Sequence, residues 1–365
     1  MNGADDDKLK ATECVHGNGR SVGVNPVAEV VTTKCSSDED SGGDDQIPDQ
    51  NVTVETHTDG EKDVRLISID PEAEVVDLVH SRLEIIEGLE FLAKVKCLYL
   101  RQNLITKIQN LDCLTTLVEL ELYDNQITKI ENLDTLVNLE SLDLSFNRIR
   151  EIEHLENLTK LKKLFLVHNK ISEIKNLESL KDLEMLELGD NRLREIKNLH
   201  HLTSLKELFL GKNKISRLQG LEKLSMLKTL SIQGNRIVQL EGLDTLTGLE
   251  GLYISQNGIL EIDGLTNNTK LVTLDLADNR VTRIQNLSHL QDLEEFWFNG
   301  NRLEEWSDLE ELSKLPKLRT VYLEHNPIYK DSAYRRKVML TLPFLTQLDA
   351  TLCRQAMSPQ QSTPS

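Results

Sequence analysis

The sequence predicts an α/β solenoid, a curved stack of repeats whose parallel sheet lines the concave side. Three observations lead to this prediction: one asparagine recurs at a fixed period, apolar residues keep register with it, and the pattern degrades only at its two ends. The asparagines stand at Asn103, Asn125, Asn147, Asn169, Asn191, Asn213, Asn235, Asn257, Asn279 and Asn301, always 22 residues apart.

The apolar pattern around each asparagine reads L-x-x-L-x-L-x-x-N-x-I-x-x-I-x-x-L-x-x-L, and one copy runs from Leu139 to Leu158. This period and pattern are typical of a leucine-rich-repeat horseshoe. The L-x-L segment predicts a short strand, the asparagine a turn whose backbone groups its side chain satisfies. The apolar residues three apart predict a 3₁₀ or helical turn on the convex side. A single repeat cannot bury its own leucines, so neighbours must stack.

The array is predicted to span residues 71–326 and to contain about twelve repeats. The first copy has Ser81 in place of the asparagine, and the last asparagine, Asn326, follows after a step of 25 residues. At one convex position Asn268 replaces the usual leucine, which predicts looser packing there. Strands spaced about 4.8 Å apart give an inner surface roughly 50 Å long.

Residues 1–70 lack the repeat and are rich in acidic and small polar residues. Between Met1 and Asp63 the chain has 15 Asp or Glu and 5 Lys or Arg. Such a segment cannot bury enough apolar surface to offset its conformational entropy, so we predict a disordered acidic tail. The acidic residues after Ser36, Ser37 and Ser41 make these serines candidate sites for an acid-directed kinase. The alternative is a solvated tail without regulation.

Residues 327–365 are predicted to form a C-terminal cap and a short tail. After Pro327, residues 331–340 suit a helix with Asp331 as its N-cap. Leu345 and Leu348 belong to an apolar stretch that can cover the last repeat. A solenoid needs such a cover because its terminal repeat otherwise exposes its core.

Composition argues against several classes of function. The formal net charge is −18, which disfavours nucleic acid or an anionic membrane as partner. Five cysteines without a C-x-x-C pair favour neither a disulfide nor a zinc framework, and suit a reducing compartment. The nine histidines show no metal-ligand spacing, and no glycine loop suits a phosphate. We therefore expect no enzyme, cofactor, metal site or membrane span.

The central residue of each L-x-L strand should point into the concave space rather than into the core. Six of these residues are aromatic, several are acidic and none is Lys or Arg. In order they are Asp77, Tyr99, Glu121, Asp143, Phe165, Glu187, Phe209, Ser231, Tyr253, Asp275, Trp297 and Tyr322. Exposed aromatic residues among charges mark an interface, so the pattern indicates a partner protein with a basic, partly apolar surface. The alternative is that the rings lie flat and only stabilise the sheet.

Across residues 76–355, the 22-residue repeat, the strand count, and the ending Asn-Pro-Ile-Tyr followed by Leu-Pro-Phe-Leu resemble the regulatory subunit 7 family of protein phosphatase 1. The resemblance implies a nuclear regulator with a cytoplasmic pool. It would bind the protein phosphatase 1 catalytic subunit, alter its activity, maturation or location, and admit a third regulatory protein. It assigns partner binding to Asp143, Phe165, Glu187, Phe209, Asp275, Glu295, Trp297 and Tyr322.

Other functions remain open at this point. Many phosphatase regulators carry a short basic-Val-x-Phe docking motif, and Lys162-Lys163-Leu164-Phe165 is only a distant relation of it. Binding should therefore depend on the folded concave face. A scaffold of a ribonucleoprotein or cytoskeletal complex is the second hypothesis, and catalysis by the chain itself is the third.

Overall fold

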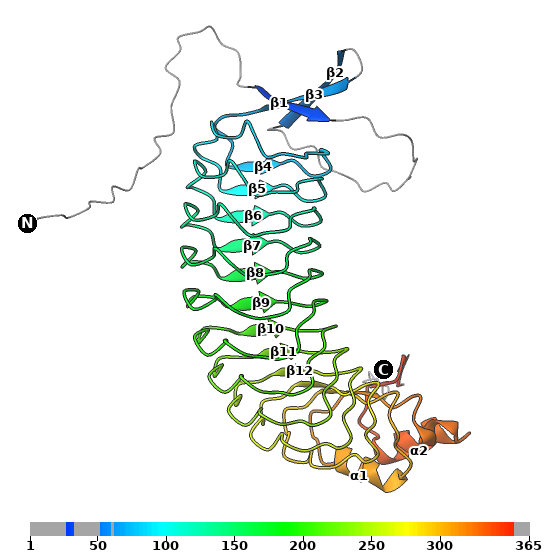
Figure 1. Ribbon diagram of the computed structural model, residues 1–365. Helices are drawn as coiled ribbons and strands as arrows, with labels where there is room; N and C mark the ends of the chain where they lie inside the picture. The colour runs from blue at the N-terminus through cyan, green and yellow to red at the C-terminus, as the bar shows by residue number, and fades with distance from the viewer. Residues whose placement is uncertain (1–26, 33–51, 60–61, 354–365) are drawn as a thin grey trace, which may run out of the picture.

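The computed structural model, which describes residues 27–32, 52–59 and 62–353, is a solenoid built on a 14-stranded sheet (Figure 1). Twelve of its strands run parallel in sequence order, which confirms the predicted parallel sheet. They are β4 (Val75–Asp77), β5 (Cys97–Tyr99), β6 (Glu119–Glu121), β7 (Ser141–Asp143), β8 (Lys163–Phe165), β9 (Met185–Glu187), β10 (Glu207–Phe209), β11 (Thr229–Ser231), β12 (Gly251–Tyr253), β13 (Thr273–Asp275), β14 (Glu295–Trp297) and β15 (Thr320–Tyr322).

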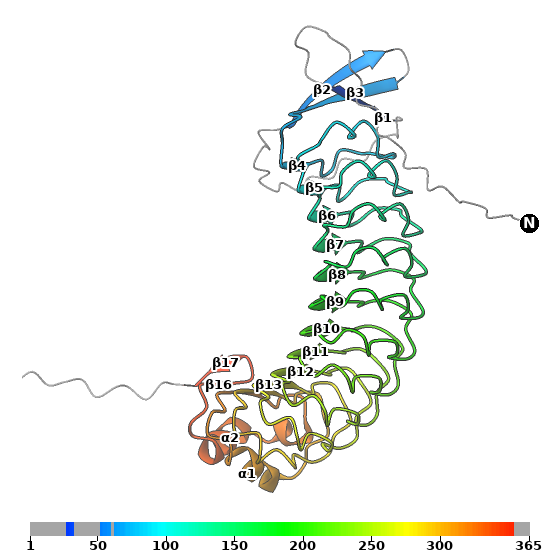
Figure 2. The same cartoon turned by 90° about the vertical axis from the view of Figure 1, so that its left-hand side faces the viewer.

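The strands lie on the inner side of the curved stack, and the connecting segments form its outer side (Figure 2). Leucines and isoleucines fill the space between the two sides in one continuous core, and most of them have no exposed surface. Because each repeat contributes the same apolar positions, every repeat buries its leucines against both neighbours. The curvature follows because the convex segments need more room than three-residue strands.

Each asparagine of the 22-residue series connects two repeats through hydrogen bonds. Asn147 Nδ2 donates to the carbonyls of Leu122 in the preceding repeat and of Leu144 in its own, at 2.9 and 3.1 Å. Its Oδ1 accepts the N–H of Ile127 at 2.9 Å. The residue is 6% exposed, so these bonds satisfy backbone groups that water does not reach.

A second asparagine series, which the sequence interpretation did not recognise, lies on the convex side. Asn132 and Asn176 have φ angles of 58° and donate from Nδ2 to an isoleucine carbonyl of the preceding repeat at 2.7 Å. Asparagine tolerates this left-handed conformation better than other residues with side chains. Glycine takes the position in other repeats: a Cβ at Gly264, where φ is 70°, would lie 2.1 Å from Leu240 O.

The sequence left a 3₁₀ or a helical turn open for the convex side, and in most repeats the structure shows single turns with the i→i+3 hydrogen bonds of a 3₁₀ helix. In a typical repeat, Leu114 N–H donates to Leu111 O and Leu117 N–H to Leu114 O, so each turn closes by itself. The exception is the repeat with the 25-residue step, which contains the 3₁₀ helix η1 (Trp306–Asp308) and helix α1 (Leu309–Leu312). Its three additional residues provide the length for a helical turn.

The predicted loose packing at Asn268 is wrong. Its side chain has no exposed surface, and its Nδ2 donates to the carbonyls of Leu243 and Leu246 at 3.0 Å. The amide thus replaces the lost apolar contact with two hydrogen bonds to the preceding repeat. Only its Oδ1 lacks a partner.

The N-terminal end of the stack carries a small antiparallel sheet of β1 (Val27–Thr32), β3 (Lys62–Ile69) and β2 (Val52–Asp59). This differs from the predicted disordered tail over residues 1–70. The physical reason is local: β1 and β2 are rich in Val and Thr and β3 contains Val and Ile, and these β-branched residues favour strands. Ser36, Ser37 and Ser41 lie outside the described residues.

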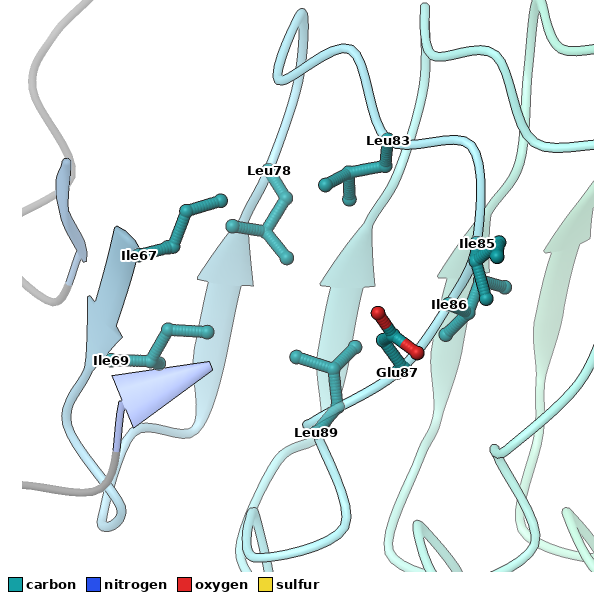
Figure 3. A pocket seen from close by; sticks show the side chains of 8 residues that line it. All are labelled: Ile67, Ile69, Leu78, Leu83, Ile85, Ile86, Glu87 and Leu89. Carbon is teal, nitrogen blue, oxygen red and sulfur yellow. The ribbon is translucent and has the colours of Figure 1, made fainter. Parts of the chain in front are cut away.

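Strand β3 also shifts the start of the core. Ile67 and Ile69 are 1% exposed and point toward Leu78 and the rest of the first repeat, around a pocket of about 10 Å³ (Figure 3). Such a volume holds roughly one water molecule. The pocket is therefore a packing seam, and the apolar core begins before residue 70.

Beyond the array, the C-terminal segment contains the 3₁₀ helix η2 (Pro327–Lys330), helix α2 (Tyr334–Thr341), β16 (Gln347–Leu348) and β17 (Thr351–Leu352). Strand β16 extends the parallel sheet next to β15, and β17 pairs with it antiparallel. Helix α2 begins three residues later than predicted, with Ala333 rather than Asp331 as N-cap, because Asp331 Oδ1 accepts the Ala333 N–H in a preceding turn.

The cysteines differ in part from the expectation of no disulfide. Cys97 and Cys353 are free thiols. Cys113 is disulfide-bonded. Counting cysteines could not reveal this, because pairing depends on which thiols the fold brings together.

Candidate protein-binding face

The concave face is built from the two outward residues of each strand. The middle residue of every strand from β4 to β15 is buried, and its two neighbours face the other side of the sheet. Because the strands pair in register, their third residues form one row, from Asp77 to Tyr322. Their first residues form a parallel row that includes Glu295. We call the row of third residues, from Asp77 to Tyr322, the concave row.

Four of the predicted partner-binding residues occupy consecutive strands in the N-terminal half of the concave row. The register places Asp143 beside Phe165, Phe165 beside Glu187, and Glu187 beside Phe209. All four side chains are half-buried. Acidic and aromatic side chains therefore alternate along the concave row, and each ring has a carboxylate on one or both sides.

The carboxyl groups of this half are held in a poorly hydrated environment. Burial raises the pKa of Asp143, an effect that hydrogen bonds from Ser145 oppose. Burial also raises the pKa of Glu187, and the negative charge of Asp143 adds to it. Within the described chain neither carboxylate has an ion-pair partner. A cation from a partner would stabilise the charged form of both carboxylates, because it would replace the solvation that burial removes.

The other four predicted residues lie in the C-terminal half. Asp275 stands between Tyr253 and Trp297 on the neighbouring strands, and Tyr322 follows Trp297. The Trp297 ring contacts those of Tyr253 and Tyr322 edge to face, at centroid distances of 6.5 and 5.9 Å. Glu295 lies in the parallel row, two residues before Trp297 on the same strand.

The ring contacts explain the burial of Asp275. Tyr253 and Trp297 stand on strands on either side of β13, so the contact between their rings passes over the strand that carries Asp275. Asp275 is only 4% exposed, and burial raises the pKa of its carboxyl against the opposing hydrogen bonds from Ser255 and Ala277. Trp297 Nε1 is buried without a hydrogen-bond partner, an unusual condition for an indole.

The two halves are separated by Ser231 and Tyr253, which also lie in the concave row. Ser231 Oγ donates to Gln233 Oε1 at 2.5 Å and presents no large side chain. Tyr253 leans over Gly251, where an added Cβ would lie 3.0 Å from its ring. The eight predicted residues therefore form two aromatic and acidic clusters rather than one continuous patch.

One feature of this side of the molecule was missed by the sequence interpretation. In the turns that follow β6, β7 and β8, the ring of Tyr123 packs tilted against Phe146 at a centroid distance of 5.0 Å, and Phe146 stacks on His168 at 4.8 Å. His168 Nδ1 lies 2.6 Å from Asp190 Oδ2 in the next repeat. Phe146 is 38% exposed, and its φ of 54° lies in the left-handed region, which is uncommon for an aromatic residue. The signal in the sequence was the 22-residue spacing of residues 146, 168 and 190.

The chemistry of the face is that of recognition. Among the described residues, no group of three His, Cys, Asp or Glu side chains could hold a metal ion. No described helix is long and apolar enough to cross a membrane. The concave row offers rings and poorly solvated carboxylates, which are groups that bind a polar, cationic and partly apolar surface.

Family models for leucine-rich repeats match residues 167–254 and 244–362, which together make up more than half of the chain. A further model, for two copies of the repeat, matches residues 115–157 and 137–181. This chain belongs to the leucine-rich-repeat family. The described fold and the sequence match thus agree on the leucine-rich repeat.

Short stretches are similar to named phosphatase regulators. Over 51 residues the chain is 65% identical to protein phosphatase 1 regulatory subunit 7 of Xenopus tropicalis, and 61% identical to the Homo sapiens protein of the same name. Over 44 residues it is 59% identical to the protein phosphatase 1 regulatory subunit SDS22 homolog of Caenorhabditis elegans. These matches cover 12–14% of this chain and 14–15% of the relatives' own length.

Solved structures support the fold of this leucine-rich-repeat protein. An internalin of Listeria monocytogenes superposes with a TM-score of 0.63 at 28% identity, covering 77% of this chain and 87% of that one. A leucine-rich-repeat protein of Leptospira interrogans gives 0.64 at 22% identity, covering 71% and 74%. The second likeness concerns the fold alone.

Proposed function

We propose that this protein is a non-catalytic regulatory subunit that binds the catalytic subunit of protein phosphatase 1 through its concave row. The observation that carries the proposal is the in-register placement of rings beside Asp143 and Glu187, whose carboxylates have no ion-pair partner among the described residues. The relatives named as phosphatase regulators supply the choice of partner, through local identities of 59–65%.

The face has the chemistry that such an interface needs. Aromatic side chains on a rigid sheet lose little entropy when they bind, and they commonly dominate interface energies. Carboxylates with raised pKa values favour Lys and Arg on the partner, because a cation restores the solvation that burial removed. The partner surface should therefore be basic around apolar pockets.

The regulatory consequences form the finer part of the proposal. A rigid groove that holds a folded enzyme surface can alter that enzyme's activity, its maturation or its location. We place the complex in the nucleus with a cytoplasmic pool, and its open convex side leaves room for a third regulatory protein. The metal chemistry of dephosphorylation would belong to the partner.

The test is the affinity of purified catalytic subunit for variants of the full chain, measured by isothermal titration calorimetry. Phe209→Ala and Trp297→Ala should each cost at least about 2 kcal/mol of binding free energy, roughly a 30-fold weaker Kd. Circular dichroism should show an unchanged array, because both side chains are only half-buried.

Met226→Ala is the matched control, because Met226 is 51% exposed and lies outside the strands. It should bind like the unaltered chain. Wild-type affinity in a Phe209→Ala, Trp297→Ala double variant would exclude the concave row as the interface. Affinity purification that recovers a ribonucleoprotein or cytoskeletal complex without the phosphatase would favour the scaffold hypothesis instead.

A further inference from the structure

A line of cations runs along one edge of the solenoid, at the position that follows each asparagine of the 22-residue series. Five consecutive repeats place a basic residue there, and we call this set the basic ridge: Arg148, Lys170, Arg192, Lys214 and Arg236. The backbone N–H of each donates to a carbonyl of the preceding repeat at 2.8 Å. Consecutive cations are therefore spaced like strands, about 4.8 Å apart along the stack.

The side chains of the ridge point away from the core. Around Asn147 and Asn191 the chain alternates buried and exposed residues, so the basic residue after the asparagine faces outward. Arg150 and Arg194, two residues further along the same extended segments, are exposed with the same alternation. The asparagine turn separates this edge from the strands, so the ridge lies outside the concave row.

None of these cations forms an ion pair with a described residue, and this contrasts with another edge of the same repeats. Immediately before the strands, the corresponding position carries Glu140, Lys162, Glu184, Lys206, Lys228 and Glu250. There, Lys162 pairs with Glu140, Lys206 with Glu184, and Lys228 with Glu250, at 2.7–2.8 Å. Neighbouring repeats thus place opposite charges beside each other on the edge before the strands, and like charges beside each other on the basic ridge.

Like charges stacked at this spacing repel each other, and they do so in a chain whose net charge is −18. Acidic residues are abundant in the chain, yet none is paired with the ridge among the described residues. Asp190, two residues before Arg192, contacts His168 rather than a cation of the ridge. A bound anionic group would remove the repulsion.

Beyond the basic ridge, the same edge of the solenoid becomes apolar over one repeat. After Arg236 the next repeat has Gly258, and Val238 and Leu260 stand 47% and 55% exposed on the same segments. A Cβ at Gly258 would lie 3.3 Å from Val238 Cγ1, which shows that the two repeats are in contact there. Basic residues resume at Arg280 and Arg302. Along this edge, the basic ridge is therefore followed by an aliphatic surface and then by two further basic residues.

We propose that the basic ridge is a docking surface for an extended acidic segment of a partner protein, with aliphatic residues where the edge becomes apolar. Seven steps from Arg148 to Arg302 span about 34 Å, and an extended peptide of roughly ten residues covers that length. A protein segment fits better than a nucleic acid, because aliphatic side chains at the break find no partner in a phosphate backbone. The overall negative charge of the chain also opposes a long polyanion. This proposal does not rest on the phosphatase assignment.

The test uses the full chain and a fluorescent peptide of about twelve residues, Asp and Glu at both ends and two Leu at the centre, a length that spans the ridge. Fluorescence anisotropy at low salt should show saturable binding that weakens as salt is added. Replacing three ridge cations together, Arg192→Gln, Lys214→Gln and Arg236→Gln, should weaken binding by at least about tenfold.

The matched control replaces Lys162, Lys206 and Lys228 by Gln, because it changes the net charge by the same amount on the paired edge. It should bind the peptide within about twofold of the unaltered chain, since only long-range charge has changed. Equal weakening by the two triple variants would overturn the ridge as a specific site. All six side chains lie at the surface, and circular dichroism should confirm that both variants are folded.

Two further measurements decide the nature of the occupant. A peptide in which Ser replaces the two Leu should bind more weakly, and equal binding would remove the apolar break from the proposal. Single-stranded RNA of the same charge should compete less well than the peptide. If RNA competes better, the occupant is a nucleic acid and the proposal of an acidic protein segment is wrong.

Discussion

The side chain of each repeating asparagine donates hydrogen bonds to backbone carbonyls and accepts one from a backbone N–H. Asn213 Nδ2 donates to the carbonyls of Leu188, Leu210 and Gly211, and its Oδ1 accepts the Leu193 N–H at 2.9 Å. These groups belong to two adjacent repeats. Losing the amide leaves buried backbone groups unpaired, and each of them costs free energy because water cannot replace the bond.

Replacing Asn213 by alanine should therefore lower the free energy of unfolding by about 2–4 kcal/mol, measured by denaturant titration. Asn138 is a suitable comparison, because its two hydrogen bonds are accessible to water: Nδ2 donates to Thr115 O at 2.9 Å and Oδ1 accepts from Lys160 Nζ at 2.7 Å. Asn138→Ala should cost less than about 1 kcal/mol. Similar losses at the two positions would mean that the asparagine series does not hold the repeats together.

Carboxylates of the concave row reduce stability at neutral pH. Burial raises the pKa of Glu187 above its unfolded value, so the folded chain binds more protons between the two pKa values. Stability is then greatest below the unfolded pKa, about 4.3, and falls as the pH rises through the folded pKa.

Glu187→Gln keeps the shape of the side chain and removes the loss of stability that ionisation of Glu187 causes. The variant should be more stable than the unaltered chain at pH 7 and equally stable near pH 4, as measured by denaturant titration at both pH values. Glu184 is the control, because its hydrogen bond with Lys206 lowers its pKa and it lies outside the face. Glu184→Gln should bring no gain at pH 7. A Glu187→Gln variant that is no more stable at pH 7 would show that the carboxylate is well solvated.

At the scale of the strand, the sequence was sufficient to predict where each strand lies and which of its residues face outward. Each strand has only three residues and exists because its neighbours pair with it, so its position follows from the repeat register. Alternation along the strand then decides which residues face outward. The sequence therefore placed all eight candidate residues on one face, and Trp297 and Tyr322 on adjacent strands.

The convex segments could not be predicted in the same way. Apolar residues three apart fit a helical turn and a series of isolated turns equally well, because both bring the same residues inward. The structure selects isolated turns because left-handed residues such as Asn132 and Asn176 interrupt any continuing helix. Where the spacing lengthens before Asn326, the helical turns η1 and α1 form.

At the scale of the whole molecule, a solenoid is most exposed to unfolding at its ends, because a terminal repeat has only one neighbour. Ile67 and Ile69 of β3 supply apolar cover at the N-terminal end. Replacing both by serine should remove that cover and place polar groups against the core. Hydrogen exchange should then show lost protection in β4 and β5, while β10 stays protected.

Ile85→Ser provides the comparison for this prediction, because Ile85 borders the same seam but is 50% exposed. It should leave exchange in β4 and β5 almost unchanged. Uniform loss of protection along the whole array would contradict local unfolding from the end. No loss at all after the double replacement would mean that β3 does not cover the first repeat.

The sequence by itself determined the repeat, the register and the identity of the residues on the concave face, because these follow from periods of 22 and 2 that any stacked arrangement must respect. Only the tertiary structure decided which neighbours satisfy each side chain. Stacking brings Tyr253 and Trp297 into contact over the strand of Asp275 and leaves the Trp297 indole without an acceptor. It also pairs the cations of one edge, while those of the basic ridge form no ion pair with a described residue. These are contacts between residues at least 22 positions apart, so no local pattern contains them.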